Sequence, residues 1–207
     1  MTASPGPLPD LRAPQPGAEG LAEPMRSRWS PSVFDDEHEL DDESLEVLLR
    51  AAQWAPSSGN LQPWNFVVCR RGDAGHRRLL PTLTRGNSGW VPRASVVLVG
   101  VARVEDDEGN TLPYGVYDTG QAAAHVTLQA RAMGLHAHQF AGFDHDALSR
   151  SMRIPPSMRV LAGIAVGVTG DPGDVDERTA ARDHRDRVRH PVAEFVHVGE
   201  WDVRWPG

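Results

Sequence analysis

The sequence contains no lysine, so all 21 of its basic side chains are arginines. Cysteine occurs once, as Cys69, which excludes an intrachain disulfide and leaves a thiol that we expect to be buried and inert in an apolar strand. No run of about 20 apolar residues is present, so we expect no membrane-spanning segment. The first residues also lack a basic start followed by an apolar stretch, and we therefore predict a cytoplasmic protein without a secretory signal.

Positive charge is in deficit as well. The formal net charge is -7 at pH 7, from 28 acidic and 21 basic residues. This balance argues against nucleic acid as the main partner, because phosphate backbones require a basic surface. Hydrophobic residues make up 40% and charged residues 24% of the chain, which is typical of a soluble globular protein. A length of 207 residues fits one domain with a sizeable core.

The N-terminal stretch has a different composition from the rest of the chain. Residues 1–25 hold six prolines among glycine, alanine and serine. Such a composition cannot build a packed core, so we predict a disordered tail. The folded domain is expected to cover residues 26–207.

Hydrophobic periodicity predicts alternating helices and strands, and hence a mixed α/β layer structure. A helix begins at the acidic pair Asp41-Asp42, which can cap it, and ends before Pro56. Further helices are expected at 118–133, which ends at Gly134, and at 144–152. The predicted strands are 65–69, 95–102, 135–140 and 160–168, followed by a strand-like alternation at 191–201.

The most informative stretch connects the first helix to the first strand. It reads Pro-Ser-Ser-Gly-Asn-Leu-Gln-Pro-Trp from Pro56 to Trp64. Proline ends the helix, and the following glycine and Asn60 permit a tight turn. Ser57 and Ser58 then present hydroxyls and backbone N–H groups on a loop. The pattern suits a polar, phosphorylated ligand, although an ordinary helix-to-strand connection has a similar composition.

Together with Arg28-Trp29-Ser30 upstream, this loop resembles the flavin-binding signature of the FMN-dependent nitroreductase family. In that family an Arg-x-Ser-x-basic motif supplies part of the phosphate site. Arg28 and Ser30 match the motif, and arginine forks and hydroxyls suit a phosphate group. Ser32 departs from it, because it stands where the family has a basic residue near the N1–O2 edge of the flavin. Arg93 and Arg131 are candidates for replacing that charge.

Later segments continue the resemblance in the family's order. Asn87 matches an asparagine that meets the pyrimidine edge of the ring, and it can equally be a turn former between two glycines. The segment Phe140, Ala141 and Gly142 matches a stretch whose backbone N–H faces flavin N5.

A last basic element lies near the C-terminus. Arg187 and Arg189 match a late basic-x-basic-x-Pro element that closes on the phosphate. The resemblance thus spans about residues 26–201.

The resemblance implies an α+β, nitroreductase-like fold with a central, mainly antiparallel sheet flanked by helices. It also implies a homodimer with a C-terminal strand arm, in which Pro56, Ser57 and Ser58 approach the cofactor of the second subunit. FMN would accept hydride from NAD(P)H and reduce a small acceptor, a nitroaromatic or quinone, in a ping-pong cycle. The flavin carries this chemistry, so no catalytic side chain is assigned.

Three alternative functions share features with this sequence. A specialised relative, such as a reductive dehalogenase or a flavin-destroying enzyme, shares the same motifs. Ser32 motivates a flavin-binding protein without turnover. A third alternative is a metal-binding module, because His136, His138 and His145 offer three imidazole nitrogens; we assign no metal.

Overall fold

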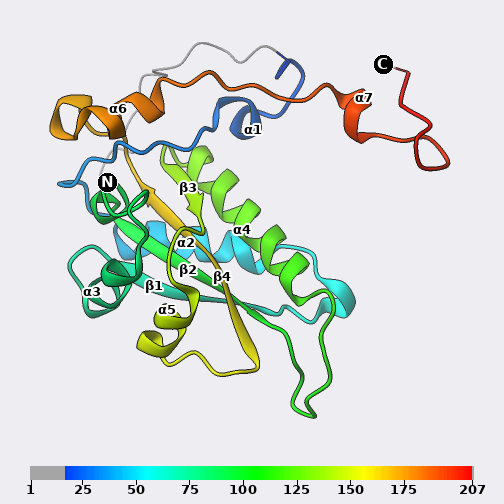
Figure 1. Cartoon of the computed structure of the whole chain (residues 1–207), viewed down its shortest axis with the longest axis horizontal. Coiled ribbons are helices and arrows are strands. Elements are labelled where there is room, and N and C mark those ends of the chain that lie inside the picture. The colour runs from blue at the N-terminus through cyan, green and yellow to red at the C-terminus, as the bar shows by residue number, and fades with distance from the viewer. Residues whose placement is uncertain (1–16, 207) are drawn as a thin grey trace.

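The centre of the molecule is a four-stranded sheet in which every neighbouring pair of strands is antiparallel (Figure 1). This is a computed structural model, and residues 17–206 are described. The strand order across the sheet is β1-β2-β4-β3. The strands are β1 Trp64–Arg70, β2 Val96–Arg103, β3 His136–Phe140 and β4 Met158–Gly167. All four strands predicted between residues 65 and 168 are confirmed, as is the antiparallel α+β class.

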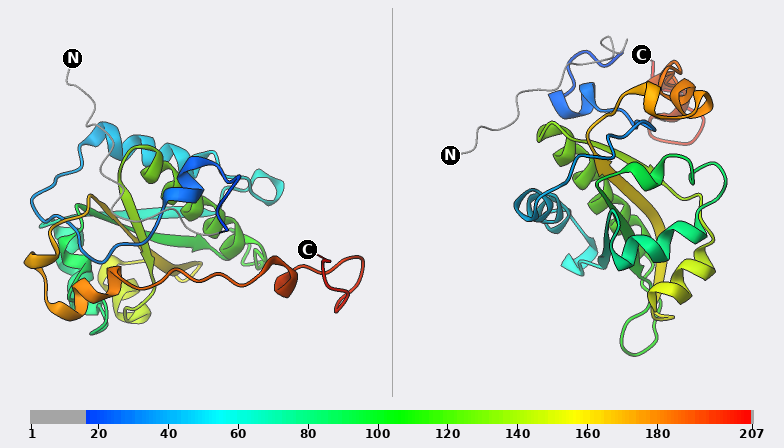
Figure 2. Two further views of the ribbon diagram at one scale, coloured as in Figure 1. Left: turned by 90° about the horizontal axis from the view of Figure 1, so that it is seen from above. Right: turned by 90° about the vertical axis from the view of Figure 1, so that its left-hand side faces the viewer.

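Helices cover both faces of this sheet (Figure 2). Helices α2 and α4 pack on one face, and α3 and α5 lie on the other. The helices are α1 Glu23–Ser27, α2 Asp42–Gln53, α3 Ala74–Leu79, α4 Gly115–Ala132, α5 His145–Met152, α6 Glu177–Asp183 and α7 Val192–Phe195. In the part of the chain that the structure describes, no helix has the length and apolarity needed to cross a bilayer.

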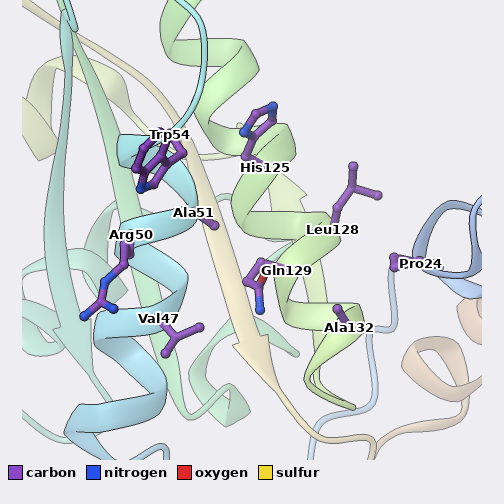
Figure 3. A pocket seen from close by; sticks show the side chains of 9 residues that line it. All are labelled: Pro24, Val47, Arg50, Ala51, Trp54, His125, Leu128, Gln129 and Ala132. Atoms are coloured by element: carbon purple, nitrogen blue, oxygen red, sulfur yellow. The ribbon is translucent and has the colours of Figure 1, made fainter.

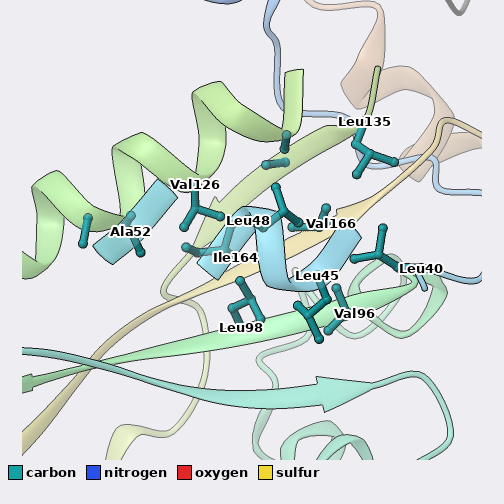
Figure 4. Packing of buried hydrophobic residues seen from close by; sticks show 14 of the residues in the cluster. Leu40, Leu45, Leu48, Ala52, Val96, Leu98, Val126, Leu135, Ile164 and Val166 are labelled. Atoms are coloured by element: carbon teal, nitrogen blue, oxygen red, sulfur yellow. The ribbon is translucent and has the colours of Figure 1, made fainter. Parts of the chain in front are cut away.

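The larger core lies between the sheet and the pair α2–α4 (Figure 4). Leu48 on α2 and Val126 on α4 are fully buried against Leu98 on β2 and Ile164 on β4. Because side chains alternate along a strand, Val97 and Val99 of β2 point to the opposite face and join a second core. The sheet is therefore covered on both sides, as its near-continuous apolar strands predict.

Local signals in the sequence set the helix ends. The Asp41 carboxylate accepts a hydrogen bond from the Ser44 N–H at 2.7 Å and caps α2. Asp144 caps α5 in the same way through the Ala147 N–H, at 2.9 Å. Gly134 follows α4 with a φ of +80°, the left-handed conformation that glycine adopts at low cost.

The two ends of the chain differ from expectation. Of the predicted tail, residues 1–16 lie outside the described residues, while α1 forms within residues 23–27. The strand expected at 191–201 is wrong, because this stretch holds α7 and an isolated bridge from His197 to Arg204. Within residues 17–206 no strand pairs with it, and the backbone forms its own bond from the Val196 N–H to the Val192 carbonyl.

Candidate functional site

Arg28 is the centre of a cluster of arginines at the N-terminal edge of the site. Its guanidinium donates to the Ser30 hydroxyl at 3.1 Å, and Arg187 donates to the Arg28 carbonyl at 2.6 Å. The Nε of Arg28 is buried and has no hydrogen-bond partner in the described part of the chain. Burial, and then the nearby charge of Arg189, lower the pKa of Arg28. The fold thus brings three predicted phosphate ligands and Ser30 together around an unsatisfied donor.

Ser32 is held by its backbone. Its N–H donates to one oxygen of Asp183 at 2.7 Å, and the Val33 N–H donates to the other at 3.0 Å. Ser32 itself is 2% exposed. The carboxylate at the end of α6 therefore fixes the N-terminal motif to a helix 150 residues away in sequence.

Trp29 points into the protein. It is 7% exposed and lies edge-on to His136, with ring centroids 5.4 Å apart. Its indole is thus a packing group between the N-terminal segment and β3.

Asn87 and Gly142 form the opposite side of the site. The Asn87 amide nitrogen donates to the Gly142 carbonyl at 3.1 Å, and its amide oxygen accepts from the Trp90 indole at 3.1 Å. A Cβ at Gly142 would lie 2.5 Å from that amide nitrogen, so any other residue would displace the Asn87 side chain. Within residues 17–206, the backbone N–H groups of Ala141 and Gly142 donate to no protein acceptor. They are available to a ligand.

Aromatic rings pack around Trp90 on this side of the site. His138 lies 4.1 Å from Trp90, centroid to centroid, in a stacked arrangement, and Phe140 meets Trp90 edge-on at 5.4 Å. The His138 Nδ1 donates to the Pro31 carbonyl at 2.7 Å, which joins β3 to the N-terminal motif. Burial is the main cause that lowers the pKa of His138, so the ring is neutral near pH 7.

The Pro-Ser-Ser loop is ordered by a different part of the fold. The Ser58 N–H donates to the buried carboxylate of Asp118 at 3.0 Å, and the Gln62 N–H donates to the Ser57 hydroxyl at 3.1 Å. Asn60 has a φ of +56°, which asparagine tolerates better than most residues. Pro56, Ser58 and Asn60 are exposed and face solvent in a single chain.

Within one chain, this loop and the arginine cluster lie at opposite ends of α4 (Figure 1). Asp118, which holds the loop, is in the first turn of α4. Arg131, in its last turn, donates to the Ser27 hydroxyl at 2.7 Å, next to Arg28. Thirteen residues of helix at a rise of about 1.5 Å separate the two anchors by roughly 20 Å. One chain therefore does not bring the two halves of the predicted cofactor site together.

An apolar groove of about 520 Å³ runs between α2 and α4 (Figure 3). Ala51 and Trp54 line it from the α2 side, and His125 and Leu128 line it from α4. Trp54 is 79% exposed, which is unusual for so large an apolar side chain. The groove lacks a cluster of charged groups suited to chemistry.

The three histidines weighed as metal ligands are dispersed. His136 packs on Trp29, His138 stacks on Trp90, and the His145 ring bonds the Val160 carbonyl at 3.2 Å. Among the described residues, no three histidine, cysteine or acidic side chains are arranged to hold a metal ion.

Two site residues were missed in the sequence. Arg182 and Asp183 lie in a segment where acids and arginines alternate, which reads as solvated surface. In the structure Arg182 lies over Trp90, with its guanidinium carbon 5.9 Å from the ring centroid, and Asp183 binds the Ser32 backbone. No local pattern signals these contacts, because each joins residues about 90 to 150 positions apart.

The chain is similar to known proteins of one family. The model of the nitroreductase family matches residues 25–88, which include the Arg28 motif and the Pro-Ser-Ser loop. An uncharacterised 15.4 kDa protein of Mycolicibacterium smegmatis is 34% identical over 144 residues, which is 66% of this chain and 96% of that protein. A protein of Archaeoglobus fulgidus with the provisional name NADH dehydrogenase/NAD(P)H nitroreductase is 29% identical over 157 residues, covering 73% of this chain and 86% of its own.

A solved structure extends the likeness over almost the whole molecule. A crystal structure described as an oxidoreductase containing FMN superposes with a TM-score of 0.80 at 29% identity, covering 97% of this chain and 98% of that one. The fold and the motifs define an oxidoreductase of the α+β class. The chain belongs to the nitroreductase family.

Proposed function

We propose that this protein is an FMN-dependent oxidoreductase. The observation that carries the proposal is the Arg28 cluster, in which a buried guanidinium N–H lacks a partner among residues 17–206 and Arg189 adds a second charge nearby. Arg28, Arg187, Arg189 and the Ser30 hydroxyl are the groups that a dianionic phosphate requires. Arg28 forms no ion pair with a carboxylate in the described residues, so its charge is available to an anion.

The other end of the site fits a flat ring with hydrogen-bonding edges. The free N–H groups of Ala141 and Gly142 would face the N5 side of the ring, next to Phe140. Asn87 keeps one amide hydrogen and one oxygen lone pair beyond its bonds to Gly142 and Trp90, which suits a pyrimidine edge. Trp29 would contribute through packing, and Ser32 would contribute through its backbone.

We further propose that the site is completed by a second copy of the chain. The roughly 20 Å between the Ser58 loop and the arginine cluster supports this, because a partner can present Pro56, Ser57, Ser58 and Asn60 to the other subunit's arginines. Beyond Arg187, which bonds the Arg28 carbonyl, the C-terminal segment with α7 extends away from the body (Figures 1 and 2). It carries apolar side chains in solvent, including Phe195 at 64% and Trp201 at 79% exposed. Such an arm gains stability by packing on a partner.

When bound, FMN supplies two-electron transfer between NAD(P)H and a small acceptor such as a nitroaromatic or quinone, in two separate half-reactions. The chain's own residues bind the phosphate, orient the ring and hold donors at its edges. The proposed compartment is the cytoplasm. A specialised reductive dehalogenase or flavin-destroying relative remains the alternative within this chemistry.

The visible spectrum of the purified protein tests the cofactor. We expect the absorption of oxidised flavin in the parent protein and its loss in the double variant Arg28→Ala/Arg189→Ala. Each arginine removed should cost about 1.5–3 kcal/mol of charge-assisted hydrogen bonding. The matched control removes two exposed arginines elsewhere, Arg150→Ala/Arg178→Ala, and should keep its flavin. A double variant at Arg28 and Arg189 that binds FMN as the parent does contradicts the phosphate assignment.

Turnover needs a second measurement. Anaerobic addition of NADH or NADPH should bleach the flavin of an oxidoreductase, and a quinone should restore the colour. A flavin that neither donor bleaches identifies a binding protein without turnover.

A further inference from the structure

We propose that Arg182, from α6, supplies the positive charge at the pyrimidine edge of the cofactor that Ser32 cannot supply. The inference rests on the proposed FMN site and names a residue that the family motif does not contain. Arg182 enters the site from a segment close to the C-terminus, whereas the motif's basic position is in the N-terminal segment.

The position of Arg182 is fixed by two contacts on the ring side of the site. Its Nη1 donates to the Gly86 carbonyl at 2.6 Å, which places the guanidinium beside Asn87. Its guanidinium carbon lies 5.9 Å from the centroid of Trp90, the indole that bonds the Asn87 side chain. Arginine over an indole is a favourable arrangement, so the side chain is held rather than free in solvent.

The charge of Arg182 is not cancelled by an ion pair. In the described residues its guanidinium lies within 4.0 Å of no carboxylate. The neighbouring Asp183 directs both carboxylate oxygens to the N–H groups of Ser32 and Val33. Arg182 also acts on His138, where its charge helps burial to lower the pKa of the imidazole, against an opposing effect of Asp183. The charge of Arg182 therefore acts on His138, which stacks on Trp90 on the ring side of the site.

The other arginines near this region are engaged elsewhere. Arg93 donates to the Phe34 carbonyl at 3.0 Å and forms an ion pair with Asp36 at 2.8 Å. Arg131 donates to Ser27 at the far end of the N-terminal motif. In the described residues, neither guanidinium donates to Ser32, Asn87 or the Trp90 ring, although the Arg93 backbone N–H bonds the Trp90 carbonyl at 3.1 Å. The side chains of the two candidates suggested by the sequence are therefore directed away from the ring side of the site.

A cation at this edge has a defined chemical consequence. Reduction places negative charge on the pyrimidine side of a flavin, and a positive group there stabilises the reduced form relative to the oxidised form. The electrons come from NAD(P)H, so no further reductant is required. Arg182 should therefore raise the midpoint potential of bound FMN, and in the described residues its guanidinium bonds the Gly86 carbonyl, whereas the Arg28 guanidinium bonds Ser30.

The test is a potentiometric titration of FMN-loaded protein, with each variant reconstituted to equal flavin content. We expect Arg182→Gln to make two-electron reduction about tenfold less favourable, a fall of about 30 mV. Arg182→Lys keeps the charge and should retain most of the potential. The control is Arg178→Gln, one turn earlier on the same helix, where the side chain is exposed, whereas Arg182 is the arginine that lies over the Trp90 ring; its potential should equal the parent's.

A second variant provides an independent check. Adding Ser32→Arg to Arg182→Gln returns a cation to the same edge from the other element, and the potential should rise again. A potential in Arg182→Gln that equals that of the parent overturns the proposal, and so does an equal fall in Arg178→Gln. Failure of the proposed function appears separately, as a parent protein that takes up no FMN when it is offered.

Discussion

The backbone N–H of Ser58 donates to the buried carboxylate of Asp118 at 3.0 Å, and this bond attaches the Pro-Ser-Ser loop to the first turn of α4. Gln121 approaches the same carboxylate and the Pro56 carbonyl, each at 3.5 Å. The loop that most resembles a cofactor motif is thus fixed at the end of α4 far from Arg28. We propose that a second chain uses it.

Complementation between two defective chains tests this arrangement. One chain carries Arg28→Ala/Arg189→Ala, and the other carries Ser58→Glu, which sets a negative charge on an exposed position of the loop. Each homodimer should bind little FMN. A mixed dimer should bind one FMN, because one of its two sites combines native arginines with a native loop. Mixed dimers without flavin would mean that each site is built from a single chain.

Asp183 should be needed for the stability of the N-terminal motif. It accepts the N–H groups of Ser32 and Val33 at 2.7 and 3.0 Å, and hydrogen bonds to a charged acceptor contribute about 1.5–3 kcal/mol. We expect Asp183→Ala to lower the free energy of unfolding by roughly that amount in urea titrations. Asp186→Ala, an exposed change on the same segment, is the control. Equal stability of the two variants contradicts this role.

Local chemistry made most of the fold predictable. The valine-rich run of β2 requires cover on both faces, and the caps at Asp41 and Asp144 form as their sequence positions imply. Gly134 follows α4 in the left-handed conformation that glycine favours at the end of a helix. The prediction of a C-terminal strand was wrong. Alternation of apolar and polar residues at 191–201 favours a strand only where a neighbouring strand supplies hydrogen-bond partners, and this stretch instead holds α7.

The candidate site was predictable only in part. Arg28 and Ser30 are two residues apart, so a short motif identifies them. The contact of Asp183 with Ser32 and that of Arg182 with Trp90 join distant segments, and only the folded chain reveals them. The cofactor assignments themselves stay predictions until flavin binding is measured.

Gly163 on β4 should be irreplaceable, because the Phe140 ring occupies the space of a side chain. A Cβ there would lie 2.4 and 2.6 Å from two ring atoms of Phe140. We expect Gly163→Ala to destabilise the protein by about 1–3 kcal/mol through overpacking. Gly120→Ala is the matched control, since nothing lies within 4 Å of its Cβ in helix α4, and it should be neutral or stabilise by up to about 1 kcal/mol. Both changes are measured by urea unfolding, and a Gly163→Ala protein as stable as the parent contradicts the prediction.

His136 should make the fold sensitive to acid. Burial, and then the charge of Arg131, lower the pKa of this histidine from 6.5 to about 4, and its Nδ1 has no partner in the described residues. In the unfolded chain the imidazole takes up its proton near pH 6.5, so between about pH 6.5 and 4 the unfolded state binds more protons than the folded one. The neutral buried ring therefore contributes stability that is present above pH 6.5 and is lost as the pH falls towards 4.

The expected loss of unfolding free energy follows from the pKa shift of His136. A difference of about 2.5 pH units corresponds to a loss on the order of 3 kcal/mol of unfolding free energy across this window. His136→Phe keeps an aromatic ring against Trp29 and removes the titrating group, so its unfolding free energy should fall less steeply between pH 6.5 and 4. The unfolding free energy of this variant should still fall somewhat as the pH decreases, because burial also lowers the pKa values of His38, His76 and His138. The control His184→Phe replaces an exposed ring and measures the effect of a histidine-to-phenylalanine change by itself. Urea titrations at half-unit pH steps decide the matter, and parallel curves for His136→Phe and the parent would show that His136 is not the group that responds to acid.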